Sequence, residues 1–250
     1  MAMTRRWQTM ALAAGFALVP GAVAAQAAPP VKASWYGDPA APDVSGVWML
    51  QPGTAATGSK EGWLPWPPPL KGSFAATYAK RIADPAARTD DPVVTCQPPG
   101  MPRFDTGTNG ALMITQTPGR VTLYRDGIPV RRVWVDGRNL PAAKDLESFS
   151  NGNAIGHYVG TDLFTEIAGV KNQPIDATGI PHSDALKISE RFHRVDATTL
   201  RIEVTLTDPA ALARPMTSTV TYTAWPDPLW EPHEFLCRPK TDYHPDKYVR

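Results

Sequence analysis

The residue of this sequence best suited to proton-transfer chemistry is Glu190, a carboxyl group inside an otherwise apolar strand pattern. It alternates with residues that would share its face of a strand: Leu186, Ile188 and Phe192. If that face lies inside the protein, burial raises the pKa of the Glu190 carboxyl, which suits a general acid or base near neutral pH. The alternative, favoured for Glu190 taken alone, is a structural ion pair with an arginine such as Arg132 or Arg191.

Other charged residues extend the proton-transfer hypothesis. Glu166 repeats the pattern one strand pair earlier, because it shares a predicted strand face with Phe164 and Asp162. Arg132 and Arg138 are the candidates for stabilising negative charge that develops during such a reaction.

His182 lies in a loop ahead of the strand that begins near Leu186. It cannot form a catalytic relay with its neighbours Ser183 and Asp184, because such a relay needs side chains that converge from different segments. Two interpretations stay open: an acid, base or ligand contact at the mouth of the fold, since binding residues concentrate on loops, or a loop histidine bonded to backbone.

Several aromatic residues on predicted strands are candidates for binding a flat apolar ligand: Trp48, Trp134, Tyr158, Phe192 and Tyr222. His157 is grouped with them as a ligand contact. Most aromatic residues of a barrel fill its core, and that interpretation is favoured. His157 and His193 lie on separate predicted strands, and His193 points away from Glu190, so neither a metal nor another cofactor is expected.

The elements that must position these residues are mainly strands. Residues 200–207 alternate strictly between apolar and polar side chains, and Asp126-Gly127 separates two β-branched runs as a hairpin turn does. The predicted strands are 45–50, 112–116, 121–125, 130–135, 157–161, 163–168, 186–194, 200–207 and 217–225. One short helix is expected over 73–83, with Ser73 as its N-cap. Eight or nine antiparallel strands without βαβ alternation predict an all-β, up-and-down barrel of the lipocalin-like kind.

Proline content divides the chain into zones. The sequence holds 27 prolines in 250 residues, about twice the usual ~5%. Fourteen fall in 28–102, seven in 103–225 and five in 226–250. We therefore expect a proline-rich N-terminal arm with the first strand and the helix (28–102), a barrel core (103–225) and a C-terminal wrapping tail (226–250).

The first 27 residues have the pattern of an export signal, with Arg5 and Arg6, an apolar run and the cleavage-site sequence Ala25-Gln26-Ala27. A periplasmic or secreted bacterial protein is the expectation. Cys96 and Cys237 are then expected to form a disulfide, worth about 4–5 kcal/mol in the chain-entropy model. A formal net charge of +1 gives no reason to expect nucleic acid as a partner, and no later segment is apolar enough to span a membrane. The sequence does not indicate an oligomeric state.

Two resemblances follow from short motifs. Ser45-Gly46-Val47-Trp48 resembles the G-x-W opening of lipocalin-type barrels, which implies that Trp48 plugs a closed barrel end. Residues 96–225 resemble an uncharacterised family of exported bacterial proteins through several stretches, among them 96–103, 116–119, 131–138, 179–183, 190–192 and 207–209. The family implies export and architecture but no activity. Where its members typically have Arg-Trp-Glu-Gly-Asp, this chain has residues 157–161, His-Tyr-Val-Gly-Thr, so no function of that acidic turn carries over.

Three functions are compatible with these features. The preferred one is an exported barrel that holds a small apolar or aromatic molecule in its lumen. The second is a cofactor-independent lyase, isomerase or hydratase on the same scaffold, using Glu190 with His182 for proton transfer. The third is a secreted interaction module whose proline-rich arms form the contact surface.

Overall fold

A computed structural model describes residues 41–51, 64–84, 86, 88–106, 110–126, 128–227 and 230–232. All of them belong to one compact unit, Val31–Arg250. The predicted signal peptide, most of the C-terminal tail and Cys237 lie outside the described residues. The Cys96–Cys237 disulfide therefore stays a prediction.

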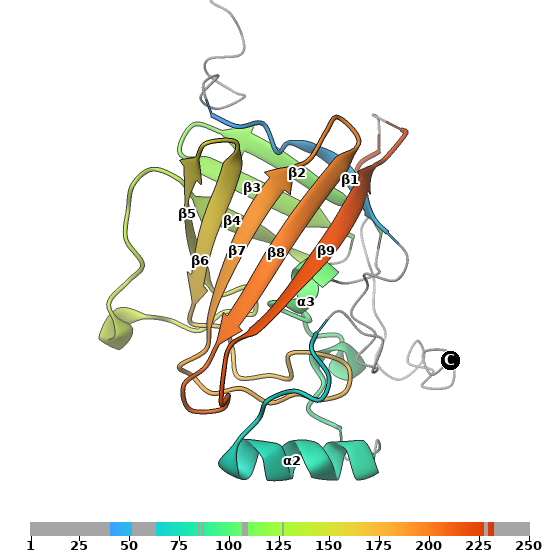
Figure 1. The fold of residues 1–250 in the computed structure, drawn as a ribbon, viewed down its shortest axis with the longest axis vertical. Coiled ribbons are helices and arrows are strands. Elements are labelled where there is room, and N and C mark those ends of the chain that lie inside the picture. The colour runs from blue at the N-terminus through green and yellow to red at the C-terminus, as the bar shows by residue number, and fades with distance from the viewer. Residues whose placement is uncertain are drawn as a thin grey trace, which may run out of the picture. The chain divides into compact units, whose positions relative to one another are not determined.

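Nine strands form a closed barrel in which each strand pairs with its sequence neighbours and β1 pairs with β9 (Figure 1). The strands are β1 (Gly46–Leu50), β2 (Leu112–Thr117), β3 (Arg120–Arg125), β4 (Ile128–Trp134), β5 (Asn153–Val159), β6 (Asp162–Ala168), β7 (Lys187–Arg194), β8 (Thr199–Thr207) and β9 (Met216–Ala224). The predicted all-β barrel is confirmed, with the larger of the two expected strand numbers.

One strand pair differs from the predicted up-and-down antiparallel topology. β4 and β5 run parallel, with Val133 opposite Ala154 and Trp134 opposite Ile155. A parallel pair needs a long return connection, and residues 135–152, with the short 3-10 helix η3 (Ala143–Asp145), provide it. The bounds of the predicted strand 157–161 were wrong at both ends. β5 already begins at Asn153 after this return, and it stops before Gly160, whose φ of +57° suits the turn into β6.

The strands bury one face, as period-two alternation predicts. On β8 the inward side chains are fully buried: Leu200, Ile202, Val204 and Leu206. On β7 the alternation places Glu190 among buried apolar residues. The core is therefore the barrel lumen itself.

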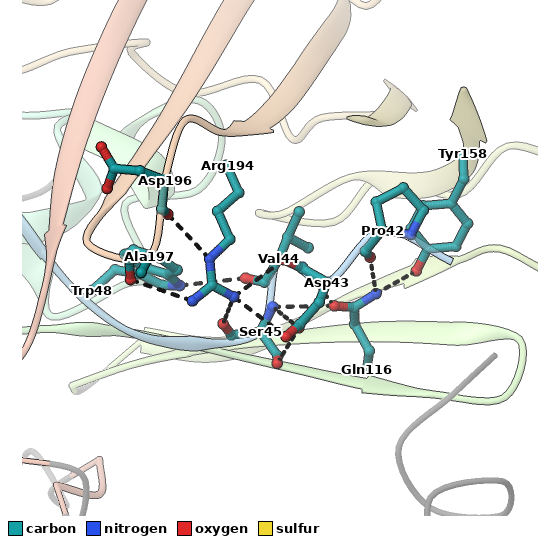
Figure 2. A network of polar contacts seen from close by, with 10 residues as sticks. All are labelled: Pro42, Asp43, Val44, Ser45, Trp48, Gln116, Tyr158, Arg194, Asp196 and Ala197. Carbon is teal, nitrogen blue, oxygen red and sulfur yellow. Dashed lines mark hydrogen bonds and ion pairs between the residues drawn. The ribbon is translucent and has the colours of Figure 1, made fainter. Parts of the chain in front are cut away.

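One barrel end is closed by the segment that precedes β1 (Figure 2). Val44 is fully buried there, and its N–H donates to Gln116 Oε1 at 2.8 Å. Trp48 is 1% exposed, and its indole N–H donates to the Val44 carbonyl at 3.3 Å. Arg194, next to the β7–β8 turn, covers the Trp48 ring with its guanidinium carbon 5.2 Å from the ring centroid. The burial expected of Trp48 is confirmed.

The opposite barrel end is covered by helices and loops. α2 (Gly72–Ala83) matches the predicted helix, although its N-cap residue is Lys71 and not Ser73. Only Tyr78 is buried on α2, and its hydroxyl lies 3.0 Å from Thr178 Oγ1 in the loop before β7. After the 3-10 helix η2 (Pro92–Thr95), the chain forms α3 (Arg103–Thr106), a single turn that the sequence did not predict. Three of its four residues are buried, so α3 contributes to the core of the barrel.

The approach to α3 is fixed by Gly100, whose φ is +68°. A Cβ atom there would lie 2.2 Å from Gln173 Nε2 and 2.4 Å from the Ser150 carbonyl oxygen. Gln173 Nε2 in turn donates to the Pro99 carbonyl at 2.7 Å, and the Met101 N–H donates to Ser150 O at 2.9 Å. The close approach of these segments, and with it the position of α3, requires glycine at position 100.

We expect Gly100→Ala to destabilise the protein by clearly more than Gly160→Ala. Gly160 also has a positive φ, but no atom lies within 4 Å of the site of its Cβ, so only backbone strain of about 1–2 kcal/mol is expected. Gly100→Ala introduces similar backbone strain and in addition forces Gln173 and the Ser150 backbone to move. Urea unfolding of both variants measures the difference, and equal losses of stability would contradict the close packing around Gly100.

Candidate functional site

Six polar side chains meet in the lumen, and each of them is at most 2% exposed. They come from α3 and from five strands, and we call them the lumen cluster: Asp105 (α3), Arg125 (β3), Arg131 (β4), Thr165 (β6), Glu190 (β7) and Tyr222 (β9). The strand members occupy inward positions of the alternation. Because charged groups are rarely buried without partners, their contacts indicate what the cluster does.

Arg131 lies at the centre of the lumen cluster. Its Nη1 donates to Asp105 Oδ1 at 2.9 Å, and its Nη2 donates to Glu190 Oε2. The guanidinium carbon lies 6.0 Å from the ring centroids of both Phe104 and Phe192, within the range of cation–π attraction. One guanidinium therefore holds two carboxyl groups and contacts two aromatic rings.

The pKa of Glu190 is lowered by its partners. Burial raises the pKa of its carboxyl, but the positive charge of Arg131 and hydrogen bonds with Asp105, Arg131 and Thr165 outweigh burial, so the pKa lies below its ordinary value. Thr165, directly opposite in the β6–β7 register, donates its hydroxyl to Glu190 Oε2 at 2.5 Å. The inward position predicted for Glu190 is confirmed, whereas the predicted upward shift of its pKa was wrong. The predicted upward shift followed from burial alone, whereas the hydrogen-bond donors around the Glu190 carboxyl group act in the opposite direction.

Asp105 has the opposite tendency. Burial and the negative charge of Glu190 raise the pKa of the Asp105 carboxyl well above its ordinary value, and Arg131 only partly offsets them. The Asp105 backbone carbonyl accepts the Tyr222 hydroxyl, and Arg125 Nη2 donates to Tyr222 Oη at 2.7 Å. Burial raises the pKa of Tyr222 as well, so this hydroxyl stays protonated. The environments of the two carboxyl groups in the lumen cluster thus shift their pKa values in opposite directions.

Of the predicted ligand contacts, Phe192 and Tyr222 lie in the lumen and are buried. Trp134 lies on the opposite face of β4 from Arg131, and the guanidinium carbons of Arg120 and Arg138 lie 5.8 and 3.9 Å from its ring centroid. Tyr158 is half-buried at the closed end, where its hydroxyl accepts from Gln116 Nε2 at 2.9 Å (Figure 2). His157 is exposed and stacks on Phe164. The last three do not reach the lumen cluster.

Glu190 pairs with an arginine, as the ion-pair interpretation expected, but the partner is neither Arg132 nor Arg191, which pairs with Asp162 and Glu203. Arg132 is exposed, and its neighbour Arg131 is the one that reaches Glu190. β4 carries apolar side chains on both faces, Val130 and Trp134 on one and Val133 on the other, so alternation alone does not identify the inward face. Arg138 is half-exposed and pairs with Asp136, and it is therefore also outside the lumen.

The remaining predicted acid–base residues lie elsewhere. Glu166 is exposed on the outer face of β6, opposite Ser189. His182 is buried, but its two ring nitrogens lie 2.8 Å from the Ser183 carbonyl oxygen and 3.2 Å from that of Lys171. This is the backbone-bonded loop histidine that the sequence left open, and it is not brought to Glu190.

Sequence reasoning missed four members of the lumen cluster: Asp105, Arg125, Arg131 and Thr165. Arg125 has the signal that identified Glu190, because it alternates with Val121 and Leu123 on one strand face. Asp105 has no such signal, since it lies on a single helical turn between prolines and glycines.

Comparison with known proteins adds no further guide to function: no protein family, curated protein or solved structure matches this chain. In the described part of the chain, no three or more His, Cys, Asp or Glu residues are arranged to hold a metal ion. None of the described helices is long and apolar enough to cross a membrane.

We expect Arg131→Met to destabilise the protein by about 3–5 kcal/mol, because it leaves the Glu190 carboxylate buried without its counter-charge. Arg132→Met, the same change one residue later on the exposed face, should alter stability by less than about 0.5 kcal/mol. Chemical unfolding of the two variants is the measurement. Similar stabilities would show that the buried ion pairs do not anchor the lumen.

Proposed function

We propose that this protein binds one small, mostly aromatic molecule with a single polar group in its barrel lumen. The observation that carries the proposal is the environment of Arg131, a charged group whose guanidinium carbon lies 6.0 Å from two aromatic ring centroids and whose partners are two carboxyl groups. Such a site offers a surface for an aromatic ring together with a donor and acceptors for one polar substituent.

The energetics of the lumen cluster support a role in recognition. Replacing buried ion pairs by well-packed apolar residues is often neutral or stabilising, so buried charges are weak support for a purely structural role. Eight-stranded barrels are just wide enough to hold one small ligand, and barrel diameter grows with strand number. A nine-stranded barrel with charged groups at its centre is therefore suited to binding a polar aromatic molecule.

The ligand would exchange with part of α3. Phe104 contacts Arg131 but belongs to α3 and not to the barrel wall. A ligand ring in its place would meet the Arg131 guanidinium on one side and lie close to Phe192. A hydroxyl group on that ring would donate to the Glu190 carboxylate and accept from Arg131. The sequence predicts a small apolar or aromatic ligand. These contacts make the proposed ligand more specific, an aromatic molecule with one hydroxyl-like group.

An acid–base enzyme is the second candidate, and a specific observation favours it. The environments of Asp105 and Glu190 drive their pKa values in opposite directions, which is how an acid and a base are paired in one site. Asp105 would replace His182 as the acid, and Arg131 would replace Arg132 and Arg138 in stabilising negative charge. Glu190→Gln would then abolish turnover while much ligand binding survives. Export to the periplasm or medium remains the expected setting for either function.

Calorimetric titration with 2-naphthol and naphthalene tests ligand binding. We expect one saturable 2-naphthol site per chain and weaker binding of naphthalene, which has no polar group. Glu190→Gln should weaken 2-naphthol binding at least about tenfold, because hydrogen bonds to charged groups contribute about 1.5–3 kcal/mol. Glu166→Gln, on the outer face, is the matched control and should leave the affinity unchanged. Absence of saturable binding, or equal affinity in the Glu190 variant, would refute the proposal.

A further inference from the structure

Two carboxyl groups and one guanidinium lie together in the lumen, and one oxygen of each carboxyl group receives no hydrogen bond within the described part of the chain. Arg131 uses Nη1 for Asp105 Oδ1 and Nη2 for Glu190 Oε2, and Thr165 donates to the same Glu190 oxygen. The remaining oxygens, Asp105 Oδ2 and Glu190 Oε1, are buried and receive no hydrogen bond from any described group. Two buried acceptors without a donor are costly.

A single proton resolves this arrangement. Asp105 and Glu190 each influence the pKa of the other and share Arg131 as a partner, and two carboxyl groups can form a hydrogen bond with each other only if one of them carries a proton. A proton between the two remaining oxygens would make one of them a donor and satisfy both. Like charges this close cannot both be ionised without a large cost, as in other carboxyl pairs that share a proton.

The surrounding charges favour Asp105 as the carrier of the proton. Thr165 on β6 donates only to Glu190, and this favours the ionised form of Glu190. Among the described residues, three other titratable or charged groups act on Asp105 and Glu190: Arg131 on β4, Arg125 on β3 and Tyr222 on β9. Arg131 donates to both carboxyl groups. Arg125, which donates to the Tyr222 hydroxyl, lowers the pKa of Asp105, but burial and the negative charge of Glu190 outweigh this effect.

The same residue attaches α3 to the barrel. The described polar contacts between α3 and the strands all involve Asp105: its carboxyl group contacts Arg131 and Glu190, and its carbonyl accepts from Tyr222. The other hydrogen bonds of α3 run to residues outside the strands. The Phe104 N–H donates to Gly100 O, the Asp105 N–H and the Thr106 hydroxyl donate to Pro102 O, and Arg103 Nη1 donates to Asp91 Oδ1 at 2.8 Å. A change in the charge of Asp105 therefore acts directly on the position of α3.

We propose that Asp105 and Glu190 share one proton at neutral pH, and that loss of this proton at higher pH releases α3 from the lumen. This inference rests on the proposed function, because α3 carries the Phe104 ring that a ligand would replace. When the proton leaves, two negative charges face each other beside Arg131, and repulsion acts between the barrel wall and α3. The lumen site is then open to a small aromatic ligand at higher pH and filled by Phe104 at lower pH.

The direction of the pH effect follows from the two carboxyl groups. The pKa of Asp105 is raised in the folded protein, so its contribution to stability is present at low pH and is lost as pH rises through the folded pKa. The pKa of Glu190 is lowered, so its contribution is present at higher pH and is lost only when the solution becomes acidic. In the window between these pKa values the pair holds one proton and α3 is most firmly attached.

Two measurements on the full chain without ligand test the inference. The ¹³C chemical shift of the Asp105 carboxyl group should be that of a protonated acid at pH 7. Hydrogen-exchange protection of the Phe104 and Asp105 amides, corrected for intrinsic exchange, should fall at least tenfold between pH 6 and pH 9. Protection of β8 amides should stay constant and thereby separate local release from global unfolding. Asp105→Asn, whose side-chain amide replaces the protonated acid as a donor, should keep α3 protected over the whole range.

A carboxylate shift for Asp105 at pH 7, or equal pH dependence in the wild type and Asp105→Asn, would overturn the inference. If Asp105→Asn does not fold, Glu190→Gln serves in its place. With Glu190 neutral, Asp105 beside Arg131 should be ionised at pH 7, and a protonated Asp105 in that variant would also overturn it. These measurements are made without ligand, so a negative result would refute the shared proton and the release of α3 but would not bear on 2-naphthol binding. If the Asp105 shift and the amide protection behave as expected but 2-naphthol does not bind, only the proposed function is refuted.

Discussion

The constraint on which the rest of this structure depends is the buried charge of Arg131. A guanidinium in a barrel lumen must be neutralised and must find acceptors for its hydrogens. The barrel wall supplies one carboxyl group, Glu190, from the far side of the lumen. The second comes from Asp105, which the chain brings in on α3. The path of the segment before α3, including Gly100 and its contacts with Ser150 and Gln173, follows from the need to place Asp105 there.

The two ends of the barrel are closed in different ways, and the difference bears on function. At one end, Val44 and Trp48 are held by Gln116 and by the Arg194 guanidinium (Figure 2), so several strands are tied together through uncharged or well-solvated contacts. At the other end, α3 is attached through groups that titrate. The first closure also includes the ion pair of Arg194 with Asp43. The second combines the Phe104 ring and the Asp105 carboxyl group on one helical turn, as the proposed exchange with a ligand requires.

Much of this fold was predictable because period-two alternation and turn residues are local signals. The nine strands, the helix near residues 73–83 and the inward position of Glu190 all follow from such patterns. The parallel pairing of β4 with β5 did not, because residues 135–152 carry no signal of a crossover. Arg131 was missed because β4 is apolar on both faces. Asp105 was missed because one helical turn has too few residues to show a period, and its role depends entirely on tertiary contacts.

The central claim is that the lumen is a ligand site which Phe104 fills in the free protein. A crystal structure of the protein grown with 6-bromo-2-naphthol tests it most directly, because the anomalous signal of bromine marks the ligand unambiguously. The account predicts a bromine peak inside the barrel, the naphthol oxygen within hydrogen-bonding distance of Glu190, and Phe104 displaced from Arg131. Bromine found only on the outer surface, with Phe104 still against Arg131, would contradict it.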